Sequence, residues 1–170
     1  AGNRQTMERN SVTYTYVYYY EQSANGTDQL LEVLNGQTPV AEYEYDLSGN
    51  ETEKEAGGVT TTYAYDEANR LESVTTQEGE DPAVEVASYE YDAAGQRTKK
   101  TVGADVTNYY YNGLDLLYTK DGSGNTIEEN VLETDGSIIS GKRADTNTYW
   151  YRQDVRGSVT NIVDDTDDVV

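Results

Sequence analysis

The sequence predicts an all-β protein made of repetitive antiparallel strand-turn-strand units. Pairs of tyrosines with the pattern Tyr-x-Tyr recur along the chain at steps close to twenty residues. Around each pair the side chains alternate with period two, which is typical of a strand with one half-buried face. A polar turn then follows most pairs. Only residues 29–34 could form one or two helical turns, so no helix competes with this interpretation.

The spacing of the tyrosine pairs indicates a repeat architecture. From the second pair onward, the steps between the second tyrosines are 20, 26, 20 and 40 residues, the last being two units. The longer step of 26 contains the polar segment 78–82, which we interpret as a loop insertion of about six residues. The pairs are Tyr14 with Tyr16, Tyr43 with Tyr45, Tyr63 with Tyr65, Tyr89 with Tyr91, Tyr109 with Tyr111, and Tyr149 with Tyr151.

Each unit reads as a strand, a turn and a second strand. In the stretch 59–65, Val59, Thr61, Tyr63 and Tyr65 share one face of a strand. Tyr, Thr and Val favour such a pleated, half-buried surface. The second strand is shorter, as in residues 71–76. Thr107 with Tyr109 and Tyr111, and Asn147 with Tyr149 and Tyr151, follow the same alternation.

The turns place an Asp at the end of the first strand. An Asp there can accept hydrogen bonds from the backbone two residues on, and a following Gly or Asn supplies a positive φ. Asn-Gly pairs at 25–26, 35–36 and 112–113 predict tight hairpins. The turns are residues 46–50, 66–70 and 92–96, and the repeat positions that they add to the tyrosines are Asp46, Gly49, Asp66, Asp92, Gly95 and, near the end, Gly157.

Composition sharpens this prediction. The net charge is -20, and only 29 of the 170 residues are Leu, Ile, Val or Phe. Such a balance is typical of disordered chains. The 17 tyrosines provide the missing apolar area. We therefore expect a thin sheet of tyrosine-lined repeats without a central core.

Several functional classes are disfavoured. The chain has no Cys and no His, which excludes thiol, imidazole and zinc-thiolate chemistry. The strong negative charge argues against nucleic acid as a partner, and no apolar run is long enough for membrane insertion. We expect no catalytic residue, no cofactor and no metal site. The chain begins with Ala1 and shows no signal peptide, so we expect a processed chain or an excised piece.

Candidate binding sites have simpler interpretations. Paired tyrosines could stack on sugars, but regular strand spacing favours cross-strand ladders. Residues 121–125 have oxygen atoms at alternate positions, as calcium loops do, yet Thr126 and Leu132 stand where an EF-hand needs Gly and Glu. A turn is favoured there. Asp164, Asp165, Asp167 and Asp168 form a solvated charge run by default, with weak cation binding as the alternative.

Three units resemble the YD repeats of the RHS family. They are Tyr-Glu-Tyr-Asp-Leu-Ser-Gly-Asn at 43–50, Tyr-Ala-Tyr-Asp-Glu-Ala-Asn-Arg-Leu at 63–71 and Tyr-Glu-Tyr-Asp-Ala-Ala-Gly-Gln-Arg-Thr at 89–98. Residues 149–160 are similar to the segment that opens the RHS core-associated region. The resemblance implies a YD-repeat region over 1–148 and the start of a core-associated segment, with an acidic tail, over 149–170.

The chain departs from the family pattern at several positions. The Asp of the motif is replaced by Asn112 and by Arg152, and residues 18–21 form a degenerate unit with an insertion at 25–28. The His of the last motif is missing. The family's self-cleavage motif Asp-Pro-x-Gly is missing too, since Asp81-Pro82 is followed by Ala83-Val84.

The resemblance implies a non-catalytic structural protein. Members of the family form β-ribbons that spiral into hollow shells in secreted toxins, wall-associated proteins and teneurins. We expect an extracellular protein that acts as a self-associating fibre body or a shell wall. The alternatives are a fragment of a toxin-encapsulating shell, and a tyrosine-rich module that binds glycans or a cell surface. Expected partners are further copies of the chain or flanking repeats, with association promoted by salt or calcium.

Overall fold

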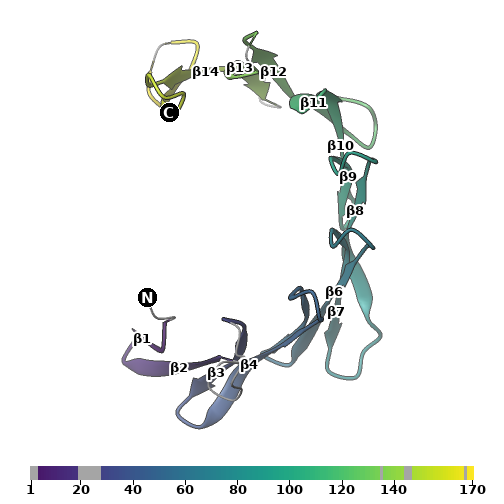
Figure 1. Ribbon diagram of the computed structural model, residues 1–170, viewed down its shortest axis with the longest axis vertical. Helices are drawn as coiled ribbons and strands as arrows, with labels where there is room; N and C mark the ends of the chain where they lie inside the picture. Colours follow the sequence, from purple (N-terminus) through teal and green to yellow (C-terminus); the bar gives the residue numbers. More distant parts are fainter. Residues whose placement is uncertain (1–3, 19–27, 135, 144–146, 167) are drawn as a thin grey trace. The chain divides into compact units, whose positions relative to one another are not determined.

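The computed structural model describes residues 4–18, 28–134, 136–143, 147–166 and 168–170. Within these ranges the chain contains no helix, and therefore none long and apolar enough to cross a membrane. Fifteen strands form one open sheet, in which each strand pairs antiparallel with the next one along the chain (Figure 1). The fold is all-β with repeated strand-turn-strand units, which confirms the predicted class.

The chain divides into two compact units, which are described separately: residues 1–88 and residues 89–170. Strands of the first are β1 (Thr6–Arg9), β2 (Val12–Tyr18), β3 (Leu30–Asn35), β4 (Thr38–Tyr45), β5 (Glu51–Ala56), β6 (Val59–Tyr65), β7 (Leu71–Glu78) and most of β8 (Val84–Tyr91). Strands of the second are β9 (Arg97–Val102), β10 (Asp105–Asn112), β11 (Asp115–Asp121), β12 (Thr126–Leu132), β13 (Ile138–Arg143), β14 (Thr148–Gln153) and β15 (Val159–Val163).

Two of the predicted Asn-Gly hairpins are present. Asn35 pairs with Thr38 across one turn and Asn112 pairs with Asp115 across the other, and Gly36 and Gly113 have φ of 65° and 61°. Such a positive φ is what a two-residue hairpin needs. The third, at 25–26, lies outside the described residues. The stretch 29–34, which could have formed a helical turn, contributes strand β3.

A β-bulge follows the Asp turns at 46, 66, 121 and 154, and the period-two pattern did not predict it. In the first unit, Glu44 pairs with Glu53 but Tyr45 pairs with Glu51, so Thr52 is the extra residue. A bulge of this kind moves the next side chain to the other face of its strand. Glu51 therefore lies on the same side of the sheet as Tyr45. The extra residues of the other bulges in the described part of the chain are Leu31, Val40, Glu72, Val86, Leu117, Ile127, Ile139 and Thr160.

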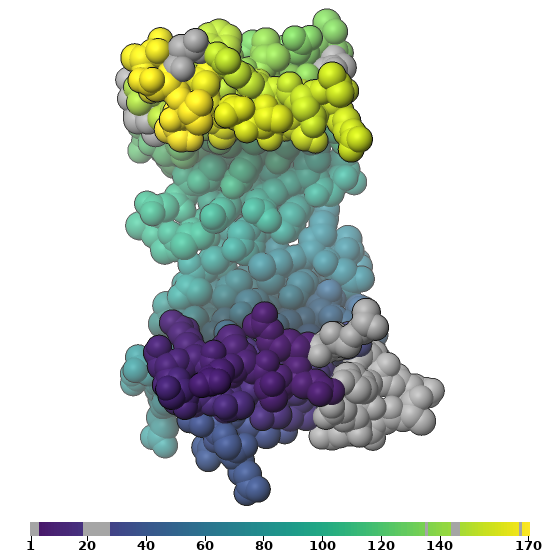
Figure 2. Space-filling model, turned by 90° about the vertical axis from the view of Figure 1, so that its left-hand side faces the viewer, coloured from purple at the N-terminus to yellow at the C-terminus, as the bar shows by residue number. Residues whose placement is uncertain are grey.

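The sheet is a single layer, as the composition predicted. Among the described residues no side chain is completely buried, and the least exposed hydrophobic residues are Val163, Ala87 and Tyr18 at 4%, 8% and 9%. The sheet is open, with β1 and β15 as its edge strands. Figure 2 shows the surface of β1 in dark purple, facing the viewer. Side-chain area is thus buried along the sheet between neighbouring strands.

Candidate functional site

In the first unit, four repeat tyrosines surround one carboxylate. Tyr45 and Glu51 are paired across β4 and β5, and Tyr65 on β6 donates a hydrogen bond of 2.9 Å from its hydroxyl to the main-chain oxygen of Glu51. The hydroxyl of Tyr63 donates to the Glu51 carboxylate. The side of the sheet that carries these tyrosines and Tyr43 is called the tyrosine face below.

This arrangement favours the neutral phenols. Burial raises the pKa of Tyr43, Tyr45, Tyr63 and Tyr65 above 10.0, and the nearby Glu51 carboxylate raises each of them further. A phenolate next to a carboxylate is disfavoured by like-charge repulsion as well as by lost hydration. The tyrosines therefore act as hydrogen-bond donors at neutral pH.

The second unit places an arginine where the first has Glu51. Arg97 follows the turn of 92–96 by the same number of residues, and its guanidinium lies 4.8 Å and 5.9 Å from the ring centroids of Tyr89 and Tyr91. Tyr111 donates a hydrogen bond of 3.0 Å to the main-chain oxygen of Arg97. The position thus keeps its contacts with tyrosines while its charge changes sign.

One kind of hydrogen bond recurs along the chain. A side chain at or near the end of a strand donates it to a main-chain oxygen near the start of the preceding strand. A tyrosine or its substitute reaches back 14 or 15 residues to a main-chain oxygen. It joins neighbouring strands in addition to the backbone hydrogen bonds between them. The pairs are Tyr18 with Arg4, Tyr45 with Leu30, Tyr65 with Glu51, Tyr111 with Arg97, and Gln153 with Ile138.

Two repeats lie in a different register from the one the tyrosine spacing predicted. In the first, Tyr18 makes the backward hydrogen bond, whereas Tyr16 donates to the sulfur of Met7 and Tyr14 pairs with Met7 and Asn35. In the last repeat, Gln153 makes the backward hydrogen bond. The Asp of its turn is Asp154, whereas the tyrosine spacing had placed the turn at Arg152. Tyr109 pairs with Thr119, and Tyr149 pairs with Gly141, within the second unit.

The Asp turn has the same geometry wherever it occurs. At Asp66, one carboxylate oxygen accepts hydrogen bonds from the backbone NH groups of Ala68 and Arg70 at 2.9 Å and 3.0 Å, and the other accepts one from Arg70 Nε at 2.7 Å. Asn69 completes the turn with a φ of 59°. The hydrogen bonds, led by that from the Arg70 backbone, lower the pKa of Asp66.

The same turn forms at the other predicted positions. Asp46 and Asp92 accept hydrogen bonds from the backbone two and four residues on, and Gly49, Gly95 and Gly157 have φ of 90°, 87° and 80° in their turns. Hydrogen bonds, first of all from the Asn50 side chain, lower the pKa of Asp46.

The turn favoured for residues 121–125 is present, and a turn of the same kind forms at Asp164, where the sequence predicted only a charge run. Asp121 and Asp164 bind the backbone in the same way, in the two segments that were also weighed as cation sites. Both oxygens of Asp121 already accept hydrogen bonds, the second from the Asn125 side chain at 2.8 Å. Among the described residues, no three acidic side chains are placed to hold a metal ion.

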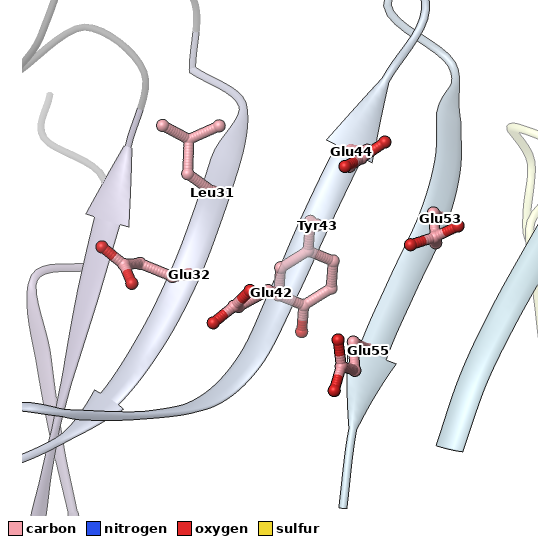
Figure 3. A pocket seen from close by; sticks show the side chains of 7 residues that line it. All are labelled: Leu31, Glu32, Glu42, Tyr43, Glu44, Glu53 and Glu55. Carbon is pink, nitrogen blue, oxygen red and sulfur yellow. The ribbon is translucent and has the colours of Figure 1, made fainter. Parts of the chain in front are cut away.

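The opposite side of the first unit carries an unbalanced row of carboxylates. Strand pairing places Glu42 between Glu32 and Glu55, and Glu44 opposite Glu53. Figure 3 shows these five side chains around a depression of about 230 Å³. This side of β3–β5 is called the carboxylate face. In the second unit the position of Glu53 holds Lys99, which pairs with Glu90 at 2.9 Å.

Comparisons with known proteins agree with the repeat geometry. Residues 45–81 match the model of the RHS repeat. A chain in the crystal structure of TcdB2-TccC3-Cdc42 is similar in fold, with a TM-score of 0.58 over 89% of this chain at 17% identity. A chain in the crystal structure of TcdB2-TccC3-TEV gives a TM-score of 0.48 over 89% of this chain at 15% identity. No curated protein matches the chain.

The chain spans only 8% and 10% of the lengths of these two solved chains. The matched segment 45–81 contains the Asp46 and Asp66 turns and the four tyrosines except Tyr43. The resemblance to the RHS, or YD-repeat, family is confirmed over residues 45–81 by this match.

Proposed function

We propose that this chain is a non-catalytic segment of the wall of a hollow RHS shell, within a longer protein. The observation that carries the proposal is the recurrence of one local structure, an Asp turn with a bulge after it and a backward hydrogen bond before it, at Asp46, Asp66 and Asp154. Its fold likeness to about one twelfth of a far longer chain supports the same conclusion. The shell alternative is therefore better supported than the self-associating fibre.

Several physical features suit a wall. A single-layer sheet with two chemically different sides separates two spaces, and it has no core that would close it into a globule. Edge strand β1 presents backbone groups that flanking repeats of a parent chain can pair with, whereas residues 169–170 already pair with part of the edge of β15. The repeat tyrosines use their hydroxyls within the sheet, which favours a structural role for them over glycan binding.

The setting and the domain boundary are part of the proposal. A shell of a secreted protein implies an extracellular location, and we assign YD repeats to 1–148 and a core-associated segment to 149–170. Flanking repeats of the same chain are the partners that the wall needs. Residues 149–166 continue the strand-turn-strand pattern with the turn at Asp154, which is compatible with that segment closing the repeat region.

Electron cryomicroscopy of the natural protein that contains this sequence tests the proposal. A hollow particle whose wall includes these strands is the expected result. The isolated chain of 170 residues provides the contrast, because a wall segment has no reason to polymerise into regular filaments. Filaments from the isolated chain, or a natural protein without a hollow interior, would overturn the proposal and restore the fibre.

A further inference from the structure

Tyr110 and Tyr118 form an aromatic pair that the repeat pattern does not explain. They are directly paired on neighbouring strands β10 and β11, with ring centroids 4.6 Å apart and ring planes 21° from parallel. Tyr110 lies two residues before the turn residue Asn112. Before the turns at Asp46 and Asp92 the corresponding positions hold Glu44 and Glu90, on the side opposite to the tyrosine face.

The pair is accessible from solvent. Tyr110 is 40% exposed, so a small oxidant in solution can reach its ring. The ammonium of Lys120 lies 5.8 Å from the ring centroid of Tyr110 and 5.5 Å from that of Tyr118. It does not lie between the two rings, which contact each other directly. Directly paired residues of an antiparallel sheet hold their Cβ atoms about 5 Å apart. Two phenols are thus kept within bonding reach by the backbone register itself.

We propose that Tyr110 and Tyr118 are a site of oxidative cross-linking, at which a dityrosine bond forms within one chain. The co-reactant is a peroxide used by a peroxidase. Each phenol loses one electron and one proton and becomes a phenoxyl radical. The two radicals join by a carbon–carbon bond between their ortho carbons, and both rings regain aromaticity when the two ortho hydrogens move to the oxygens. Two hydrogen atoms leave in total and reduce one hydrogen peroxide to two water molecules.

The geometry favours this pair over the tyrosines of the repeats. Radical coupling requires two rings in contact before either radical reacts elsewhere. On the tyrosine face, Tyr65 and Tyr111 hold their hydroxyls in hydrogen bonds to main-chain oxygens, which fixes their rings. The bond between the ortho carbons requires one ring to turn out of the stack, and the ring of Tyr110, at 40% exposed, faces solvent. The inference does not depend on the proposed shell.

The cross-link would fasten β10 to β11 by a covalent bond close to the hairpin at Asn112-Gly113. A covalent link between paired strands restricts the unfolded chain, as a disulfide does. This chain contains no Cys, so a disulfide between its strands is impossible. A dityrosine would supply the same kind of link from the residue that the chain uses most for packing.

Treatment of the chain with horseradish peroxidase and hydrogen peroxide, followed by isolation of the monomer, tests the proposal. Cleavage before Asp separates residues 105–114 from residues 115–120, in which Tyr118 is the single tyrosine. Mass spectrometry should find these two peptides joined, with the loss of two hydrogen atoms and with dityrosine fluorescence. The joined species should disappear in Tyr110→Phe and in Tyr118→Phe, both of which keep the ring stack.

Tyr109→Phe is the matched control, because Tyr109 is next in sequence but lies on the other side of the strand, opposite Thr119. It should form as much of the cross-linked species as the unaltered chain, and far-ultraviolet circular dichroism should show all variants folded. Absence of the joined peptides in the monomer would overturn the proposal. So would a cross-link that survives in Tyr110→Phe, or dityrosine found only between chains.

Discussion

The hydroxyl of Tyr65 donates a hydrogen bond of 2.9 Å to the main-chain oxygen of Glu51, 14 residues earlier. Glu51 follows the turn of one repeat, and Tyr65 precedes the turn of the next. The backbone pairing of β5 with β6 runs from Ala56 with Val59 to Glu53 with Thr62, so it does not include Glu51. The phenol therefore replaces a ladder hydrogen bond at the end where the two strands separate.

Replacement of Tyr65 by Phe should destabilise the first unit by about 1 kcal/mol, the usual cost of a lost hydrogen bond to a half-buried carbonyl. Chemical denaturation followed by circular dichroism measures the loss. Tyr110→Phe is the control, because the described residues offer its hydroxyl no hydrogen bond. An equal loss of stability in both variants would contradict a specific role for the Tyr65 hydroxyl.

Glu53→Lys should stabilise the chain. It places a cation opposite Glu44, as Lys99 is placed near Glu90, and it removes a like-charge pair from the carboxylate face. The gain should be about 1 kcal/mol at low ionic strength and should shrink when salt is added, since Glu44 is exposed and Glu53 is only half-buried. Lys99→Glu is the reciprocal variant and should destabilise. A gain from Glu53→Lys that does not change with salt would show that charge is not its cause.

Acid should weaken the Asp turns. The pKa of Asp66 is lowered in the folded chain, so the turn contributes stability above the unfolded value of 3.8 and loses it as the pH falls through the folded value. Asp66→Asn lacks this contribution at every pH. The difference in unfolding free energy between the two proteins should therefore narrow as the pH falls below about 5. If the difference in unfolding free energy does not change with pH, the charge of the Asp66 carboxylate is not what stabilises the turn.

Much of the fold follows from the sequence because its repeat is local. Tyrosines at alternate positions specify a short strand, and an Asp before Gly or Asn specifies a short turn. Because each strand pairs with the next one along the chain, the order of strands in the sheet needs no further information. The units that contain Asp46, Asp66 and Asp92 are therefore found where the pattern predicts them.

The remaining features depend on pairing between strands. The bulge at Thr52 moves Glu51 to the tyrosine face, and no local property of that residue indicates it. The carboxylate face arises from the alignment of β3, β4 and β5, because Glu32, Glu42 and Glu55 are far apart in sequence. Gln153 replaces a tyrosine with an amide that makes the same hydrogen bond, so a search for tyrosines alone places the last repeat two residues too early.

Alkaline pH should unfold the tyrosine face. The charge of the residue after each turn, Glu51 or Arg97, should set the pH at which the tyrosines ionise. Because folding raises the pKa of Tyr65 above 10.0, first through burial and then through Glu51, the neutral phenol stabilises the fold below pH 10.0. This stability is lost as the pH rises through the folded value.

Glu51→Gln should lower the pKa of Tyr65 towards 10.0, whereas Arg97→Gln should raise the pKa of Tyr111, since Arg97 lowers it. Ultraviolet absorbance of the phenolates, combined with Tyr65→Phe and Tyr111→Phe to assign them, measures both shifts. Shifts in the same direction would contradict an electrostatic role for this position.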